Sequence, residues 1–193
     1  MDEEKLKSVI LNNPAMGKYL DKDNFDIVFA DDKRRELNQK YGGGGGIEAW
    51  FPDDEGVGEY KNPNLGKYTI EIYDKELVNN PNQAAGAVFR DALHFMAELD
   101  PKYQNLRKNF ADNFLDTEKN FLQKKYKEEN PKLSFDDWMN RRMIEGYIRG
   151  GFGEQSQYGE LFNKTYRENG ISIEAYSPKQ REVINQMKQY LAY

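Results

Sequence analysis

Polar and apolar residues alternate at three places in the first eighty residues of the chain. The alternation is clearest over 67–73 (KYTIEIY), and it recurs over 25–30 (FDIVFA) and over 47–51 (IEAWF). Successive side chains of a strand point to opposite faces, so a two-residue period predicts β-strands. These three short segments predict a small antiparallel or mixed sheet of about three strands in the N-terminal part.

The pattern becomes helical after residue 80. Over 81–99, apolar residues recur at spacings of three and four, and this stretch is the most apolar helix predicted in the chain. We expect it to be the central helix, with its face toward the sheet formed by Phe89, Leu93 and Met96. Pro101 ends it, because proline disfavours helical backbone in the residue before it.

Other helices are predicted on both sides of this segment, and residues 31–40 are predicted to be a helical turn or a loop. Ser134 and Ser177 are typical N-caps, and Pro178 stands at the favoured first helical position. The remaining predicted helices cover 3–13, 101–115, 117–129, the stretch from Ser134 to about Gly150, and the stretch that follows Ser177. The chain is therefore predicted to be α+β. We expect a single domain over 1–193, with a sheet-containing part at about 1–80 and a mainly helical part at about 81–193.

An uninterrupted glycine run, Gly42–Gly46, precedes the second predicted strand. A phosphate-binding loop requires a lysine and a hydroxyl residue directly after its last glycine, and here Ile47 and Glu48 follow. Two interpretations stay open: a flexible connector, or a place where the backbone passes close to another group.

Composition excludes several kinds of chemistry. The 193 residues include no cysteine and one histidine. Disulfides, thiolate catalysis and Cys-based metal sites are therefore excluded, as is a zinc site built from two or three histidines of one chain. Aromatic residues make up 13% of the chain, a fraction that is typical of a folded protein rather than a disordered one.

Charge is distributed unevenly. Residues 1–100 carry twelve basic against twenty acidic residues, a net charge of −8, whereas residues 101–150 carry eleven against eight, a net charge of +3. The acidic excess disfavours a dedicated nucleic-acid-binding protein. No apolar run approaches the about 18 residues of a membrane-spanning helix, and the acidic N-terminus differs from a signal peptide. We therefore expect neither a membrane association nor a secretory signal.

The only histidine, His94, lies in the most apolar helix, three residues after Asp91. A strand followed by a helix with this spacing resembles the zincin metallopeptidases, whose HExxH motif provides two zinc ligands and a general base. In this resemblance, His94 takes the position of the second histidine of the motif, Asp91 that of the glutamate and Asp100 that of the third zinc ligand. Arg90 stands at the first histidine, and an arginine cannot bind zinc. The resemblance thus implies a degenerate zincin-like scaffold rather than an intact motif.

Longer blocks of the chain resemble uncharacterised domains encoded by tailed phages and prophages. The blocks are GGGGIEAWFPDDE, KNPNLGKYTIEIYDKELVNNP, DALHFM, LDPKY, WMNRRMIEGYIRGGF and SPKQREVINQMKQYL, which together extend over most of residues 40–193. This resemblance implies an origin in a phage or mobile element. It also implies a place in the host cytoplasm or inside a virion.

These observations predict a non-enzymatic protein-binding or structural protein that needs no cofactor and whose partner is another protein, of a virion or of a host. Aromatic residues in a glycine-punctuated stretch, together with two arginines, predict the partner-facing surface, because tyrosine and arginine are frequent anchors of interfaces. The predicted surface consists of Tyr158, Phe162, Tyr166, Arg142 and Arg149.

Two enzymatic alternatives stay open beside the binding protein. The first is a metal-dependent peptidase with Asp91 as the base and His94, Asp100 and Glu98 as zinc ligands. The second is a muramidase-type hydrolase that uses a pair of carboxylates. The candidates for that pair are Glu48, Asp53, Asp54, Glu55, Glu71 and Asp91. In a plain structural interpretation, His94 forms a hydrogen bond with Asp91 or Glu98.

Overall fold

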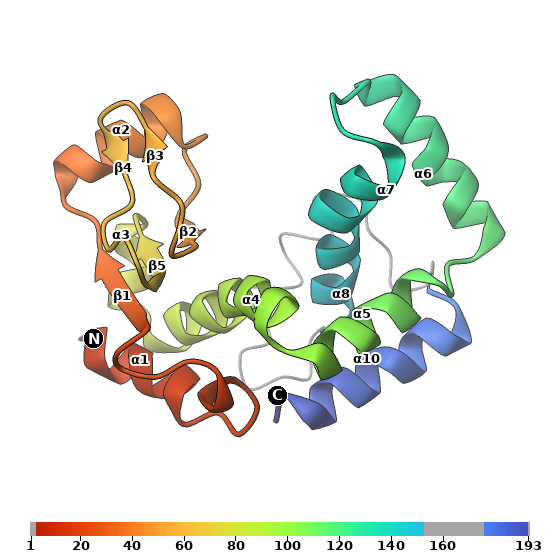
Figure 1. Ribbon diagram of the computed structural model, residues 1–193, viewed down its shortest axis with the longest axis horizontal. Helices are drawn as coiled ribbons and strands as arrows, with labels where there is room; N and C mark the ends of the chain where they lie inside the picture. The colour runs from red at the N-terminus through yellow and green to blue at the C-terminus, as the bar shows by residue number, and fades with distance from the viewer. Residues whose placement is uncertain (1–2, 153–175, 193) are drawn as a thin grey trace. The chain divides into compact units, whose positions relative to one another are not determined.

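The computed structural model describes residues 3–152 and 176–192. The chain divides into two compact units, a first unit that ends at Asp100 and a second that runs from Pro101 to Leu191 (Figure 1). The sheet and the long apolar helix share the first unit, so the division falls one helix later than the boundary predicted at about residue 80. The prediction of a single domain over 1–193 stays a prediction.

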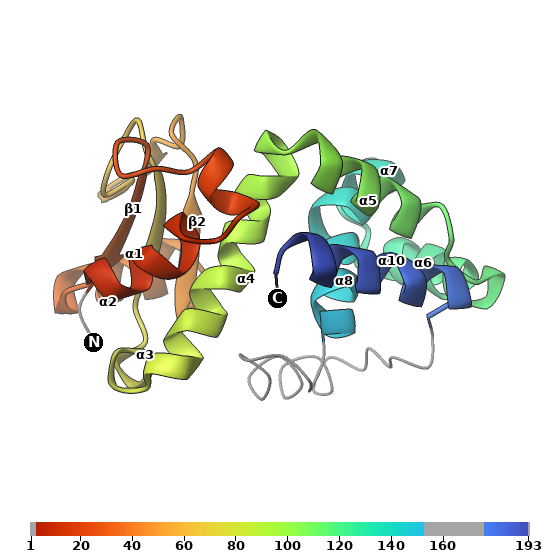
Figure 2. The ribbon, with the colours of Figure 1, turned by 90° about the horizontal axis from the view of Figure 1, so that it is seen from below.

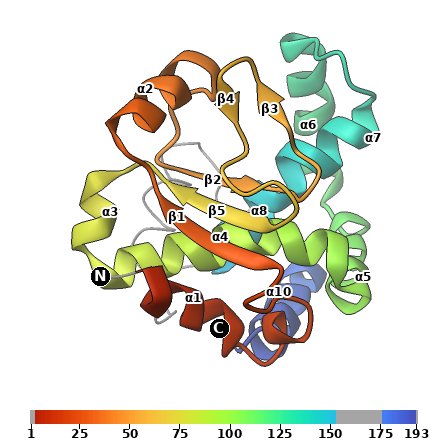
Figure 3. The same cartoon turned by 60° about the vertical axis from the view of Figure 1, so that its left-hand side comes forward.

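The first unit contains the predicted three-stranded sheet, in the order β1 (Phe25–Phe29), β5 (Tyr68–Ile72), β2 (Ile47–Trp50) (Figure 3). Strand β1 is parallel to β5 and β2 is antiparallel to it, so the sheet is mixed and the α+β prediction is confirmed. The loop between β2 and β5 contains a two-stranded hairpin, β3 (Gly56–Val57) and β4 (Tyr60–Lys61). These strands of two residues are too short to show an alternating pattern.

One face of the sheet packs against α4 (Pro81–Leu99) and α1 (Glu3–Leu11), which lie side by side (Figure 2). Ile70 and Ile72 of β5 are fully buried. The Phe95 ring of α4 lies 6.3 Å from that of Phe25 and 5.4 Å from that of Phe51. The residues predicted to face the sheet from α4, Phe89, Leu93 and Met96, are all buried. The burial predicted for these three side chains is thus confirmed.

The other face of the sheet lies beneath α2 (Asp32–Tyr41) and the β3–β4 hairpin. A second apolar cluster forms there from Ala30, Trp50, Tyr60 and Tyr73, with Leu37 of α2 packed against it. Residues 31–40, predicted as a helical turn or a loop, form most of a ten-residue helix, for which the Asp31 side chain accepts a hydrogen bond from the Arg34 N–H. The first unit also contains a short 3-10 helix, Met16–Lys18, and α3 (Lys75–Asn79).

The described part of the second unit is helical. It comprises α5 (Pro101–Ala111), α6 (Asp116–Glu129), α7 (Phe135–Trp138), η2 (Met139–Met143), α8 (Ile144–Phe152) and α10 (Pro178–Tyr190). Helix α10 lies alongside α5 (Figure 1). It begins with the predicted cap, since Ser177 and Gln180 exchange hydrogen bonds between side chain and backbone. The rings of Phe110, Phe114, Tyr147 and Tyr176 pack at this unit's centre.

The segment between α7 and α8 departs from the continuous α-helix that the sequence predicts. Residues Met139–Met143 form a π-helix, in which the Ile144 N–H donates to the Met139 carbonyl five residues earlier. Among the described residues, no helix combines the length and the apolar character needed to cross a membrane.

Candidate functional site

The residues of the zincin resemblance lie along α4 and at its end, in different surroundings. Asp91 and Asp100 are buried, His94 is half-buried and Glu98 is exposed. Asp100 accepts a hydrogen bond from the Tyr19 hydroxyl at 3.3 Å, and Glu98 accepts one from the Tyr68 hydroxyl at 2.9 Å. Both carboxylates therefore bind tyrosines of the same unit.

Arg90, which stands at the first-ligand position of the motif, forms an ion pair with its neighbour. Its Nε lies 3.6 Å from Asp91 Oδ1. The guanidinium thus lies beside the carboxylate that would act as the base of a peptidase. Within residues 3–152 and 176–192, no three His, Asp or Glu side chains gather in a group that could hold a metal ion. The donor set of His94, Glu98 and Asp100 therefore does not fit a zinc site in this structure.

The predicted partner-facing residues lie mostly outside the described part of the chain. Tyr158, Phe162 and Tyr166 belong to 153–175, which the structure does not describe, and the side chain of Arg142 is likewise not described. Arg149, on α8, is 14% exposed, and its Nε lies 3.8 Å from Glu145 Oε2. Arg149 thus pairs with a residue of its own helix, and its predicted contact with a partner stays a prediction.

Two of the candidate carboxylates of the muramidase alternative lie close together, on the face of the sheet that α2 covers. Glu48 of β2 and Glu71 of β5 are directly opposite each other in the antiparallel register, so their side chains lie on the same face. Both residues are candidates from the sequence. Their pairing, however, depends on the register between β2 and β5, which the alternating pattern does not specify.

A hydrogen-bonded network, here named the acid–tyrosine network, surrounds this pair. The Tyr60 hydroxyl donates to Glu48 and lies 2.5 Å from the Tyr73 hydroxyl, which donates to Glu71 at 2.5 Å. Asn38 completes the network at the Glu48 end, where its amide donates to Tyr60 at 3.1 Å. Two carboxylates are thus joined by a chain of two phenols.

Arg34 closes the other end of the acid–tyrosine network. Its Nε and Nη2 donate to the two oxygens of Glu71 at 2.7 and 2.5 Å, and its guanidinium carbon lies 4.9 Å from the centre of the Tyr60 ring. The Trp50 indole donates to Glu71 at 3.0 Å. Such a bidentate pair is the strong form of an Arg–carboxylate contact.

Burial sets the proton affinities of this network. It raises the pKa of Glu48, and the nearby Glu71 charge acts in the same direction, against the Tyr60 hydrogen bond. Burial, together with the hydrogen bond to Glu48, raises the pKa of Tyr60 to about 12. Burial followed by the hydrogen bond to Glu71 raises the pKa of Tyr73. The phenols therefore act as proton donors at neutral pH.

This geometry gives a structural site rather than a hydrolytic one. Glu71 has no exposed surface and accepts from four donor groups, the two nitrogens of Arg34, the indole of Trp50 and the hydroxyl of Tyr73. A glycosidase needs both carboxylates open to the sugar. Because Glu71 has no room for a substrate, the Glu48–Glu71 pair gives the muramidase alternative no support.

The glycine run lies against the acid–tyrosine network. A Cβ atom on Gly42 would lie 2.8 Å from the Asn38 amide nitrogen and 2.9 Å from the Tyr60 hydroxyl. Gly43 and Gly44 have φ values of 80° and 75°, a region that L side chains rarely adopt. Of the two open interpretations, close approach of the backbone therefore applies at Gly42. The run ends near a small pocket that Gly44–Gly46, Tyr73 and Asp74 help to line.

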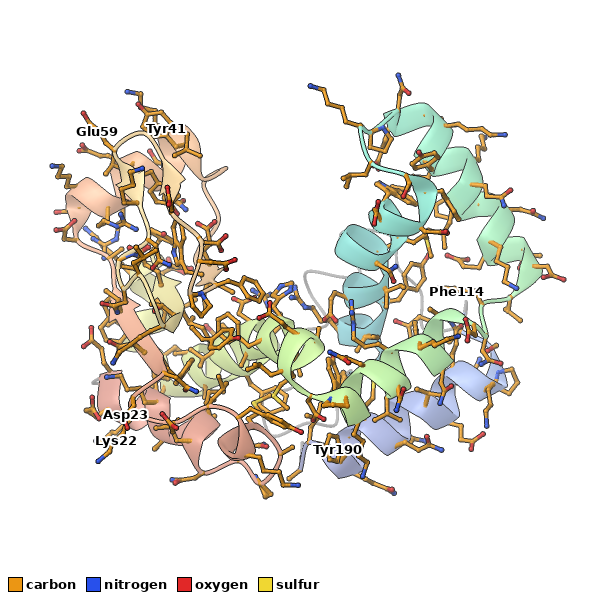
Figure 4. The ribbon with its side chains drawn as sticks, viewed as in Figure 1. Lys22, Asp23, Tyr41, Glu59, Phe114 and Tyr190 are labelled. Carbon is orange, nitrogen blue, oxygen red and sulfur yellow. The ribbon has the colours of Figure 1, made fainter. Side chains whose placement is uncertain are left out.

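The second unit contains a larger cavity, the α5–α6 groove, of about 520 Å³. Its apolar part is formed by Ala111, Phe114, Leu122, Phe135, Met139 and Ile144. Figure 4 labels Phe114, which lies just beyond α5 and is buried. The other eight of the fourteen lining residues are polar or charged.

Five charged side chains also line the groove. The basic residues are Arg107, Lys108 and Lys119, and the acidic ones are Asp112 and Asp136. Lys108 Nζ lies 2.5 Å from Asp112 Oδ2, and both side chains are more than half exposed. Arg107 differs from both lysines, because its side chain is only 18% exposed.

A buried carboxylate lies behind Arg107. Glu145 of α8, with a side chain 6% exposed, has Oε1 at 2.6 Å from Arg107 Nε. This contact is an ion pair without an aligned hydrogen bond. Arg107 Nη2 donates to the Asn140 carbonyl at 3.2 Å, and the buried Tyr103 hydroxyl donates to Glu145 Oε1 at 3.5 Å. The guanidinium is thus held between a buried acid and the groove.

Comparisons with protein-family models, with curated proteins and with solved structures gave no match for this chain. The resemblances to zincin metallopeptidases and to phage-encoded domains therefore stay predictions.

The sequence did not reveal the α5–α6 groove, although some signals exist. Phe135 and Met139, four residues apart, read as part of one continuous helix with Trp138 and Met143. The π-helix and the loops around α6 decide which of these side chains line a cavity and which fill the core. Neither feature has a sequence pattern as regular as an amphipathic helix.

Proposed function

We propose that this chain is a non-enzymatic protein-binding protein and that the α5–α6 groove receives an apolar side chain from a segment of its partner. One observation carries the proposal: a groove of about 520 Å³ that is lined by six apolar side chains together with five charged ones. Anchoring of an apolar or aromatic side chain in a pocket is the usual energetic centre of a protein interface.

The polar sites of the described residues favour this role over the two hydrolytic ones. Arg90 lies against Asp91, and the three candidate zinc ligands do not gather. Glu71 is enclosed by its donors. As the phage resemblance implies, the partner is expected to be another protein of a virion or of a host cell, with this chain in the host cytoplasm or inside a virion.

A displayed library of random twelve-residue peptides tests the proposal, because such a library samples many apolar segments at once and requires no named partner. The bait is the full chain, and the decisive variant is Ala111→Trp, which places an indole in the groove that Ala111 lines. Asn109→Trp is the matched control, because Asn109 lies on the same helix, is exposed and does not line the groove.

We expect peptides selected on the wild-type chain to bind Asn109→Trp equally well and Ala111→Trp at least tenfold more weakly. Both variants must keep the circular dichroism spectrum of the wild type. The proposal is wrong if no peptide is enriched, or if the enriched peptides bind Ala111→Trp as tightly as the control.

A further inference from the structure

The side chain of Arg107 has a different setting from the other cations of the α5–α6 groove. Lys108 Nζ lies 2.5 Å from Asp112 Oδ2 and Lys119 Nζ lies 3.7 Å from Asp116 Oδ1, and in both pairs each side chain is at least half exposed. Exposed pairs of this kind are mobile and weak. Arg107 is largely buried and fixed by groups of two other elements, Glu145 and Asn140.

The contacts of Arg107 leave some of its N–H groups without an acceptor among the described residues. A guanidinium carries five N–H groups in a rigid plane. Among the described residues, only Nη2 of Arg107 forms a hydrogen bond, with the Asn140 carbonyl, and Nε forms the close ion pair with Glu145. No described residue accepts a hydrogen bond from Nη1. Nε and Nη2 therefore hold the guanidinium in place, and the N–H groups of Nη1 can donate to a ligand.

We propose that Arg107 binds a carboxylate, the side chain of an aspartate or glutamate, in the partner segment whose apolar side chain fills the α5–α6 groove. This inference rests on the proposed function and specifies the chemistry of the partner. Two properties support it: Arg107 lines the groove, and the planar fork of donors on its guanidinium matches a carboxylate in geometry.

Charge complementarity supports an acidic partner rather than a neutral one. Residues 101–150 carry a net charge of +3, and three of the five charged residues that line the groove are basic. Asp112 and Asp136 also line the groove and repel a carboxylate, so the acid is expected to bind directly to Arg107. Glu145 acts as a positioning residue in this arrangement, because it holds the guanidinium without lining the groove.

The test uses peptides enriched on the wild-type chain, each synthesised with its acidic residue and with the corresponding amide. We expect the enriched peptides to share an aspartate or glutamate near an apolar residue. Replacing that acid by Asn or Gln should weaken binding to the wild type about tenfold. Arg107→Gln should weaken binding of the acidic peptide by a similar factor and leave binding of the amide peptide unchanged.

Two further variants separate recognition from folding. Arg107→Gln removes the cation that lies closest to the buried Glu145. The double variant Arg107→Gln/Glu145→Gln, which removes both charges, is therefore tested beside it. Arg107→Lys keeps the charge without the planar fork, and we expect intermediate binding. The inference is overturned if acid and amide peptides bind the wild type alike, or if the double variant still prefers the acid. In either case, peptide binding that Ala111→Trp abolishes would leave the proposed function intact.

Discussion

Largely buried Arg–Glu ion pairs occur in the described part of both units, and two of them, Arg34–Glu71 and Arg107–Glu145, differ in how completely their hydrogen bonds are satisfied. In the first unit, Arg34 donates to Glu71 through Nε and Nη2 and to the Lys61 carbonyl through Nη1 at 2.8 Å. Glu71 also accepts from Trp50 and Tyr73. All three donor nitrogens of the guanidinium and both carboxylate oxygens are engaged.

In the second unit, Arg107 lies beside Glu145 without an aligned hydrogen bond from Nε. Glu145 Oε2 has no hydrogen-bond partner among the described residues, although Arg149 Nε lies 3.8 Å from it. The comparison teaches that burial of an ion pair does not by itself indicate its role. A fully satisfied pair fixes the position of structural elements, whereas an incompletely satisfied pair at a groove has donors for a ligand.

The largest effect is expected when the satisfied pair is broken. Arg34→Met leaves the fully buried Glu71 charge without its cation, and removal of one partner from a buried pair costs about 3–5 kcal/mol. The measurement is urea unfolding of the full chain followed by tryptophan fluorescence. The chain has two tryptophans, Trp50 in the first unit and Trp138 in the second, so a Trp138→Phe background reports the first unit alone.

The matched control for Arg34→Met is the double variant Arg34→Met/Glu71→Met. Replacement of both partners by apolar residues of similar size is often close to neutral, so most of the lost stability should return. A double variant as unstable as the single one would contradict the assignment of the loss to an uncompensated charge.

The incompletely satisfied pair should be less costly to break. Arg107→Met removes one ion pair and one hydrogen bond, but Arg149 stays near Glu145. We expect a loss of about 2 kcal/mol, measured by the fluorescence of Trp138 in a Trp50→Phe background. A loss as large as that of Arg34→Met would remove the distinction between the two pairs.

A third prediction concerns Gly42, which lies against the acid–tyrosine network of the first unit. In Gly42→Ala the new Cβ would press on Asn38 and Tyr60, whose polar ends are held by hydrogen bonds, and we expect a loss of about 1 kcal/mol. Gly45→Ala is the control in the same run, since its nearest neighbour is a backbone oxygen at 3.6 Å. Thermal unfolding should leave Gly45→Ala within about 0.5 kcal/mol of the wild type. Equal losses in both variants would refute close packing at Gly42.

The smallest expected effect concerns pH. Because the pKa of Glu48 is raised in the folded state, the folded chain holds this proton more tightly than the unfolded chain. The contribution of Glu48 to stability therefore falls as pH rises from the unfolded pKa of about 4.3 through the higher folded one. Glu48→Gln removes this dependence, so the variant should gain stability relative to the wild type as pH rises from about 4.5 to about 7.

Glu55→Gln, at an exposed position, is the control for Glu48→Gln. Urea unfolding at several pH values gives the difference between each variant and the wild type. A constant difference for Glu48→Gln across this range would show that burial of Glu48 does not couple folding to its protonation.

Much of the fold could be predicted, because its signals are local. The three strands lie where the alternation of 25–30, 47–51 and 67–73 placed them, and α4 begins and ends at the predicted residues. The caps at Ser134 and Ser177 are present as predicted. Each of these features depends on neighbours within about four residues in the sequence.

The polar networks could not be predicted, because they depend on pairing across the chain. Glu48 and Glu71 are opposite only in the observed register, and a shift of one residue would point either of them at the apolar face. The sequence predicts a helical turn or a loop around Arg34, and the contact of Arg34 with Glu71 joins residues 37 positions apart. The Arg107–Glu145 contact likewise depends on how α5 and α8 pack. A sequence pattern provides the residue types for such contacts but not their partners.

Because of the π-helix between α7 and α8, the packing of the second unit depends on the exact number of residues in this segment. Met139–Met143 contains one more residue per hydrogen-bonded turn than an α-helix does. Removal of one residue would restore an ordinary α-helix and rotate α8 by about 100° relative to α7. The Trp138 ring beside Tyr126 and the Tyr147 ring beside Phe114 could then no longer keep both contacts. Related sequences are thus expected to tolerate substitutions in this segment more readily than single-residue deletions.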